Sequence, residues 1–208
     1  MKKGIKYLMM CALLLLMTQQ VTAQLYDTTR DDFRRTSGMP RWAVKTNLLY
    51  DATTTFNLGT ELRLARKATF DLSFNYNPWT FGDNKKFKHL LIQPEFRYWL
   101  CEAFYGHFFG AHFLYSHYNI GGVHLPFGFF PALQRHRYQG NLYGVGIDWG
   151  YHWIWSPRWS MEFSLGAGYV HTDYKVYDCK HCGGELGHEK KGYFTPTKIA
   201  VSLIYMIK

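Results

Sequence analysis

The sequence predicts an all-β fold, an eight-stranded antiparallel transmembrane β-barrel of the outer-membrane type with long extracellular loops. Apolar and polar residues alternate with a period of two over stretches of eight or more residues, which fits strands and no helix. Beyond the N-terminus, no apolar run reaches the roughly 18 residues of a membrane-spanning helix. Aromatic residues make up 19% of the 208 residues. They gather on the apolar face of the predicted strands and are too bulky to fill an eight-stranded barrel, so this face is predicted to point outward.

The N-terminal segment predicts export. Three lysines, a short apolar core and a small-x-small cleavage site ending at Ala23 are typical of a secretory signal peptide over residues 1–23. Residues 24–40 are then expected to form a flexible periplasmic lead, and residues 41–208 the barrel domain. Removing the three lysines lowers the formal net charge from +9 to +6. For an exported protein, this basic charge favours outer-membrane lipid and lipopolysaccharide as partners rather than nucleic acid.

Eight segments carry the strand pattern, and their lengths suit a tilted membrane crossing. They are residues 42–52, 56–64, 69–76, 89–99, 107–118, 143–153, 161–170 and 196–207. Pro94 has no N–H to donate, so it predicts a bulge or a weakly paired stretch in its strand.

The connections between these strands alternate in length, as they do in outer-membrane barrels, where short turns face the periplasm. The tight turns are predicted at 65–68, 101–106 and 155–158, and the long extracellular loops at 77–88, 119–138 and 171–194. The first connection, at 51–55, is the short exception.

Charged side chains on the polar face predict a lumenal charge network. Its members are Glu61, Arg63, Asp71, Glu95, Arg97, Asp148, Glu162 and Lys198. Buried charges must be paired, so we expect Glu61 with Arg63, Glu95 with Arg97, and Glu162 across from Lys198. Because eight strands leave no room for a water channel, a network that plugs the barrel is favoured over a proton or ion path.

The last predicted loop contains a Cys-x-x-Cys motif. In an oxidising compartment, Cys179 and Cys182 are expected to form a loop disulfide. The alternative is a metal site in which His181 and His188 join the two thiolates. A single Cys-x-x-Cys is a weak metal signal, so no metal and no cofactor are expected. The third cysteine of the mature chain, Cys101, would then have a free thiol or form an intermolecular bond.

Two further loop features point to the cell surface. Phe127, Phe129 and Phe130 make the second long loop apolar, as a contact patch would be, although they could also fold over the barrel mouth. An enzyme acting at the outer rim is an alternative. His171 with Asp173, and Ser116 with His117, lie near predicted strand ends, but no local nucleophile motif accompanies them.

Three stretches carry a resemblance to a known family: Trp42–Asp51, Tyr76–Phe81 and Gln93–Trp99. In these the chain resembles a Bacteroidetes family that is catalogued as a domain of unknown function and treated as small outer-membrane β-barrels. The resemblance implies a cell outer-membrane location, no established activity and no catalytic residues. Relatives linked to fimbrial gene clusters imply an association with surface appendages.

The expected function is therefore structural or interactive. The sequence predicts an outer-membrane β-barrel with a plugged polar lumen that is not an open pore. It would serve envelope integrity, adhesion or appendage association, with lipid, lipopolysaccharide and envelope or fimbrial proteins as partners. Two alternatives remain: a barrel enzyme acting on lipid or peptide at the outer rim, and a soluble lipocalin-like binder with its aromatic side lining a ligand cavity.

Overall fold

The computed structural model describes residues 40–81, 85–121, 137–177 and 185–207. The predicted signal peptide at 1–23 and nearly all of the predicted lead at 24–40 lie outside the described residues. The same holds for two predicted loop features, whose residues are Cys179, His181 and Cys182, and Phe127, Phe129 and Phe130.

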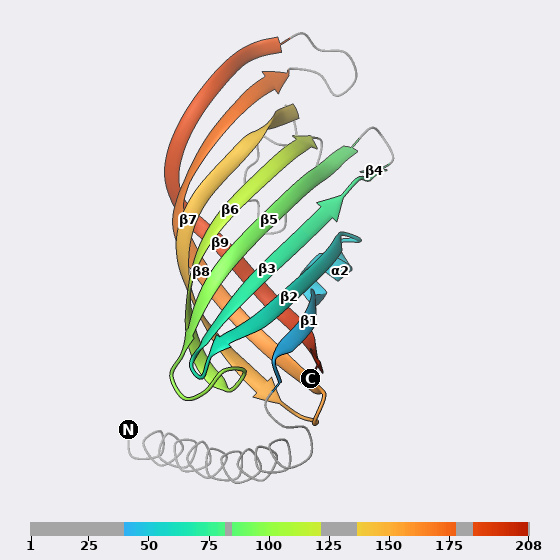
Figure 1. Cartoon of the computed structure of the whole chain (residues 1–208). Helices are drawn as coiled ribbons and strands as arrows, with labels where there is room; N and C mark the ends of the chain where they lie inside the picture. The colour runs from blue at the N-terminus through green and yellow to red at the C-terminus, as the bar shows by residue number, and fades with distance from the viewer. Residues whose placement is uncertain (1–39, 82–84, 122–136, 178–184, 208) are drawn as a thin grey trace, which may run out of the picture.

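One antiparallel sheet makes up almost the whole described chain and closes into a ring (Figure 1). Its strands are β1 (Trp42–Asn47), β2 (Phe56–Ala65), β3 (Ala68–Asn77), β5 (Lys85–Trp99), β6 (Gly106–Gly121), β7 (Arg137–Ile154), β8 (Trp159–Tyr177) and β9 (Glu185–Ile207). A two-residue strand, β4 (Thr80–Phe81), pairs with the start of β5.

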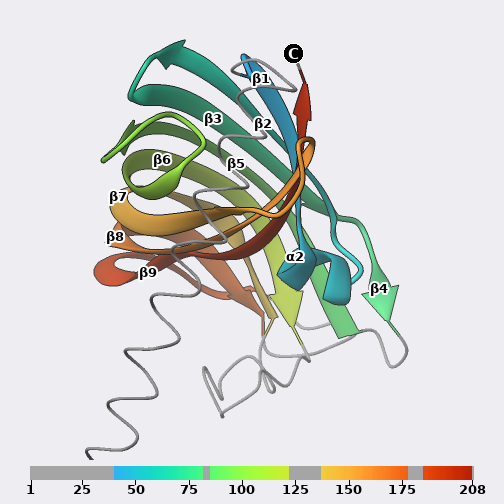
Figure 2. The same cartoon turned by 90° about the horizontal axis from the view of Figure 1, so that it is seen from below.

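Closure comes from two pairings, β3 with β5 and β9 with β1. Figure 2 shows the end of β9, marked C, beside β1. The all-β prediction with eight antiparallel strands in one ring-like sheet is therefore confirmed. Below, the turn end of the ring is the end where β2–β3, β5–β6 and β7–β8 are joined, and the loop end is the opposite one.

The first strand is shorter than the predicted segment 42–52, because a helical turn, α2 (Leu48–Ala52), replaces its second half. The Asn47 side chain caps this turn by accepting a hydrogen bond from the backbone N–H of Leu49 at 3.1 Å. Asp51 accepts further bonds from Thr46 and Asn57. In the part of the chain that the structure describes, no helix is long and apolar enough to cross a membrane.

The later strands are longer than predicted. β7 begins at Arg137, β8 continues to Tyr177 and β9 begins at Glu185, so strand includes the two ends of the predicted loop 119–138 and all the described residues of the predicted loop 171–194. The β6–β9 side of the ring is consequently taller than the β1–β3 side (Figure 1). The extensions lack a clear period of two in hydrophobicity because polar residues lie on both faces there, and the sequence pattern therefore missed them.

Two prolines interrupt the sheet differently. Pro94 lies opposite Leu72 on β3. On its other side, the pairing of β5 with β6 is missing at Pro94 but resumes in the same register. Of the two predicted outcomes, a weakly paired stretch is therefore present and a bulge is not. The bulge is at Pro196. Gly166 lies opposite Lys198 but Ala167 lies opposite Pro196, so Thr197 is an extra residue in β9.

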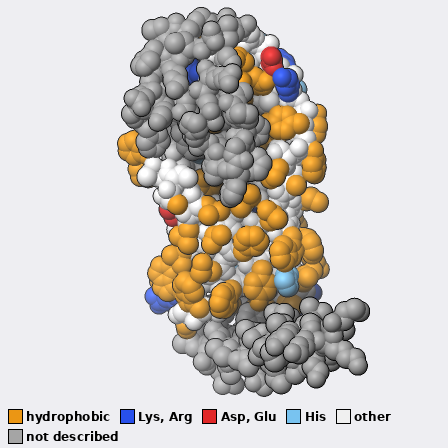
Figure 3. All heavy atoms as spheres, turned by 180° about the vertical axis from the view of Figure 1, so that it is seen from behind, with side chains coloured by type: hydrophobic (Ala, Val, Ile, Leu, Met, Phe, Trp, Pro, Cys, Tyr) orange, Lys and Arg blue, Asp and Glu red, His pale blue; other side chains and the backbone are white. Residues whose placement is uncertain are grey.

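The two faces of the ring differ sharply in chemistry. Buried positions alternate with exposed ones along the strands, and the exposed positions carry large apolar side chains. We call this exposed set the outer belt. It runs from Tyr143 to Trp153 on β7 and from Trp159 to Tyr169 on β8. Figure 3 shows hydrophobic side chains gathered over this outer face. The predicted orientation, with aromatic side chains outward and polar ones inward, is the observed one.

Candidate functional site

The interior of the ring has three layers, the first of which is an apolar cluster at the turn end. It contains Ala43, Trp99, Ala103, Phe104, Phe108, Ile154, Ile204 and Met206. Trp99 is fully buried and its indole Nε1 donates a hydrogen bond to Thr69 at 2.9 Å. Phe104 belongs to the β5–β6 turn and has a positive φ of 65°. Its side chain is buried in this cluster. This cluster fills the turn end.

The second layer is an ionic cluster centred on Arg97, which is only 1% exposed. The Nη1 atom of Arg97 lies 2.8 Å from a carboxylate oxygen of Glu61 and 2.8 Å from one of Glu162. Its Nε lies 2.5 Å from Glu95. The guanidinium also stacks over the ring of Phe108 at 4.5 Å, which joins this layer to the apolar cluster.

Two lysines complete the pairing. The Nζ of Lys45 lies 2.6 Å from Glu61 and also contacts Asp71. The Nζ of Lys198 contacts Glu95 and lies 3.2 Å from Asp148. Since β6 contributes His112, all eight strands of the ring place a titratable side chain in the ionic cluster.

The described ionic cluster holds more carboxylates than fixed cations. Glu61, Asp71, Glu95, Asp148 and Glu162 face Lys45, Arg97 and Lys198. Two histidines adjoin the carboxylates. Nδ1 of His112 is 3.1 Å from Asp148, and Nδ1 of His152 is 3.7 Å from Glu162. The five carboxylates therefore outnumber the three lysine and arginine cations by two, and the two histidines lie beside this excess.

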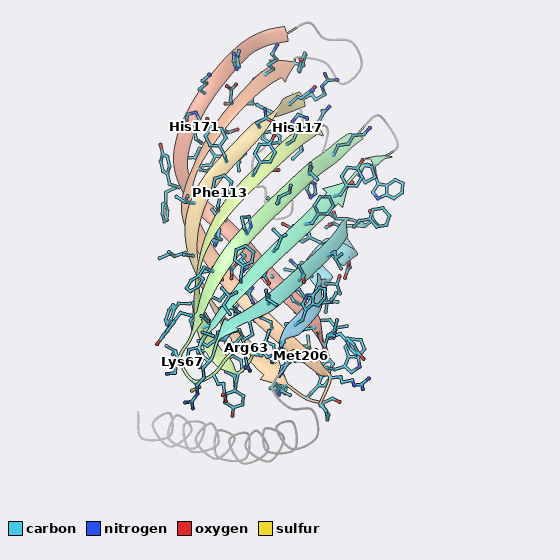
Figure 4. All side chains as sticks on the ribbon, viewed as in Figure 1. Arg63, Lys67, Phe113, His117, His171 and Met206 are labelled. Atoms are coloured by element: carbon cyan, nitrogen blue, oxygen red, sulfur yellow. The ribbon has the colours of Figure 1, made fainter. Side chains whose placement is uncertain are left out.

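Seven of the eight predicted network residues come together in this cluster, and Arg63 does not. Arg63 is half-buried near the turn end (Figure 4) and forms no ion pair with the residues that the structure describes. The expected pairing of Glu61 with Arg63 is therefore wrong, whereas that of Glu95 with Arg97 is present.

The expected pairing of Glu162 with Lys198 is also wrong. Ser202 lies opposite Glu162, and Gly166 lies opposite Lys198. Sequence reasoning also missed Lys45. The alternation along β1 could have placed Lys45 inside, because Trp42, Val44 and Thr46 lie on the opposite, outer face.

Three members of the ionic cluster resemble a metal site. Ligand atoms of Glu95, His112 and Asp148 lie within 4.8 Å of one another. The ammonium group of Lys198 contacts both carboxylates and so stands where a cation would bind. Thr197, the extra residue of the β9 bulge, bonds Nε2 of His112 at 2.8 Å. Glu95, His112 and Asp148 therefore form an ion-pair centre with Lys198.

The ionic cluster leaves little free space. A cavity of about 40 Å³ lies among Lys45, Arg97, Glu162 and their neighbours. A buried water needs roughly 10–15 Å³, so this space has room for a few waters. At Gly110 the carboxylates lie close to the wall: a Cβ there would lie 2.7 Å from an oxygen of Glu95 and closer still to one of Asp148, so a side chain would displace both.

The third layer is a cavity of about 620 Å³ at the loop end, which we call the loop-end cavity. Its lining is mainly apolar and aromatic and includes Leu91, Leu114, Leu142, Val170, Tyr118 and Tyr193. Tyr50 of α2 lines both this cavity and the small one below it. The sequence predicted a uniformly polar interior and missed this cavity, although Leu142 and Val170 share the strand parity of the polar residues.

The residues of the enzyme alternative do not assemble. Ser116 lines the loop-end cavity, whereas Nδ1 of His117 bonds Asn141 at 2.7 Å. His117 and His171 lie in the upper wall on β6 and β8 (Figure 4). Asp173 contacts His188 rather than His171.

The Asp173–His188 contact lies above the outer belt. Nζ of Lys190 also lies 3.0 Å from Asp173. The hydrogen bonds from His188 and Lys190 hold the pKa of the Asp173 carboxyl below its usual range. His188, one candidate metal ligand, is thus bound to a carboxylate. Cys101 is an exposed free thiol.

The fold and its interior define an all-β protein built as one closed ring of strands around a buried ionic cluster. The family model described as a protein of unknown function, DUF3575, matches residues 8–207. The chain therefore belongs to this family, as the resemblance indicated. No curated protein and no solved structure matches the chain.

Proposed function

We propose that this protein is an exported outer-membrane β-barrel, closed to ions, with a structural or interaction role at the cell surface. One observation carries the proposal: large apolar side chains are exposed all round the ring, while the charged side chains of the ionic cluster are buried inside it. In water such a surface is unfavourable, whereas in lipid it is the expected one.

The dimensions of the outer belt support a membrane crossing. On β7 and β8 the belt extends over about the 9–11 residues that a tilted strand needs to cross the hydrocarbon core. Trp153, Trp155 and Trp159 lie near its turn end, and Tyr143 and Tyr169 near its loop end, as in aromatic girdles. A soluble lipocalin-like binder would have the opposite arrangement, with its apolar side chains inside.

The interior supports a closed barrel rather than a pore. The apolar cluster fills the turn end, and above it Arg97, Lys45 and Lys198 cross-link the strands through buried carboxylates. An eight-stranded barrel is just wide enough to be filled by side chains. Ions would have to cross both layers.

The role at the surface rests on the tall side of the ring. Above the belt, β7 to β9 present polar side chains outward, among them Gln139, Asp173 and Lys190. This wall would extend beyond the lipid and could contact lipopolysaccharide or envelope and fimbrial proteins.

Membrane fractionation and gel mobility test the proposal. The full chain, expressed with its own N-terminal segment, is expected in the outer-membrane fraction. Its unheated band should run faster than the boiled one, because a closed barrel resists unfolding by detergent. A soluble periplasmic protein whose mobility does not change on heating would contradict the proposal.

Conductance tests the closed interior separately. Protein inserted into planar lipid bilayers is expected to give no steady open-channel current, with a porin under identical conditions as the positive control. Stable unitary steps that recur with each insertion would show that the interior is an open path and would overturn this part of the proposal.

A further inference from the structure

We propose that the loop-end cavity binds the acyl chain of an anionic amphiphile. The cavity depends only on the described fold, whereas a membrane lipid as the source of the ligand rests on the proposed function. The binding site adjoins the ionic cluster: Tyr50 lines both cavities, and Thr197 of the loop-end cavity bonds His112.

The size and lining of the cavity favour an acyl chain. Its volume of about 620 Å³ lies within the roughly 300–1,000 Å³ of small-molecule sites. Leu91, Leu114, Leu142 and Val170 supply apolar walls. The hydroxyl of Tyr118 is bonded to Thr172 at 2.6 Å, so this polar pair is already satisfied. Such a lining suits a chain without polar groups.

The rim of the cavity favours an anionic head group. On β5 to β9 above the outer belt, the described side chains include more basic than acidic residues: Lys88, Arg137, Lys175, Lys190 and Lys191 against Asp173 and Glu189. Lys191 lines the cavity itself and pairs with Glu189 at 2.5 Å, a partner that an anionic head group would replace, whereas Lys190 pairs with Asp173 on the outer face. A carboxylate or phosphate beside Lys191 would leave the chain of the ligand pointing toward Leu142.

The pairing of β8 with β9 is irregular beside the cavity. Pro196 lines the loop-end cavity and also an outer groove of about 490 Å³ that contains Ile147 and Leu165 of the belt. Pro196 has no N–H for the β8–β9 ladder and sits at the bulge. A lipid chain in the groove would therefore be separated from the cavity by a weakly paired part of one strand.

Fluorescence titration with dansyl-undecanoic acid tests the site, with the full mature chain held in amphipol. Saturable binding of one probe per chain is expected, with displacement by palmitate. Leu142→Trp fills the cavity and should lower the affinity by about tenfold or more. The matched control is Leu62→Trp on the outer face of β2, away from both the cavity and the groove, which should leave binding unchanged. Both variants must keep the heat-dependent gel mobility of the folded protein.

The head group is tested with a second pair of variants. Lys191→Gln should weaken binding of the acid but not of the alcohol with the same chain, and Lys190→Gln should change neither. Binding that does not saturate, or that Leu142→Trp and Leu62→Trp affect equally, would overturn the proposal.

The source of the ligand is read from mass spectrometry of protein released from membranes. Copurifying membrane lipid, lost in Leu142→Trp, supports entry from the bilayer. A site that fills only when free fatty acid is added supports a soluble source. An intact barrel that fails both assays contradicts this inference alone and leaves the proposed function standing.

Discussion

Replacing Arg97 by methionine is expected to destabilise the folded protein by about 3–5 kcal/mol, the usual effect of removing one partner from a buried ion pair. The guanidinium contacts Glu61, Glu95 and Glu162, all of them buried. Methionine fills much of the same volume but carries no charge. The five carboxylates of the ionic cluster would then face only two cations, Lys45 and Lys198. The loss should therefore come from uncompensated charge rather than from a void.

Urea unfolding of the protein in detergent micelles, followed by tryptophan fluorescence, measures this loss. Arg63→Met is the matched control, since Arg63 is half-buried outside the cluster, and its effect should stay within about 0.5 kcal/mol. If Arg97→Met does not fold, the double variant Arg97→Met with Glu162→Gln should recover part of the folded band. An Arg97→Met protein as stable as the unmodified one would show that the cluster does not hold the ring together.

The composition of the cluster was predictable, and its pairings were not. Alternation assigns each residue to a face, so the inward position of Glu61, Arg97 and Asp148 follows from parity alone. Which charges meet depends on strand register. The bulge at Thr197 changes the register of β9, and apart from the presence of Pro196 no sequence pattern indicates that shift.

The hydrophobic alternation also does not indicate at which level along the axis of the ring a side chain lies. Trp99, Arg97 and Leu91 all point inward from β5, yet they belong to the apolar cluster, the ionic cluster and the loop-end cavity in turn. Alternation with a period of two distinguishes inside from outside but not one level from another. The division of the interior into three layers, and hence the cavity, required the three-dimensional pairing of strands.

A charge on the outer belt tests the membrane position most directly. Ile147 lies near the middle of the belt on β7 and is 72% exposed. Ile147→Arg is expected to destabilise the protein in lipid bilayers by about 2–4 kcal/mol, the cost of a basic side chain near the bilayer midplane. Gln139→Arg, on the same strand and face but above the belt, should cost only about 0–1 kcal/mol.

Comparing Ile147→Arg with Gln139→Arg distinguishes a membrane barrel from a soluble one. An arginine at an exposed apolar position destabilises the protein in lipid but not in water. In water, an arginine at an exposed isoleucine is harmless and reduces an apolar patch, so both variants would unfold at the same urea concentration as the unmodified protein. In lipid vesicles, only Ile147→Arg should shift the transition to lower urea. Equal behaviour of the two variants in vesicles would mean that the outer belt does not face hydrocarbon, and the aromatic exterior would then have to be covered by another protein surface.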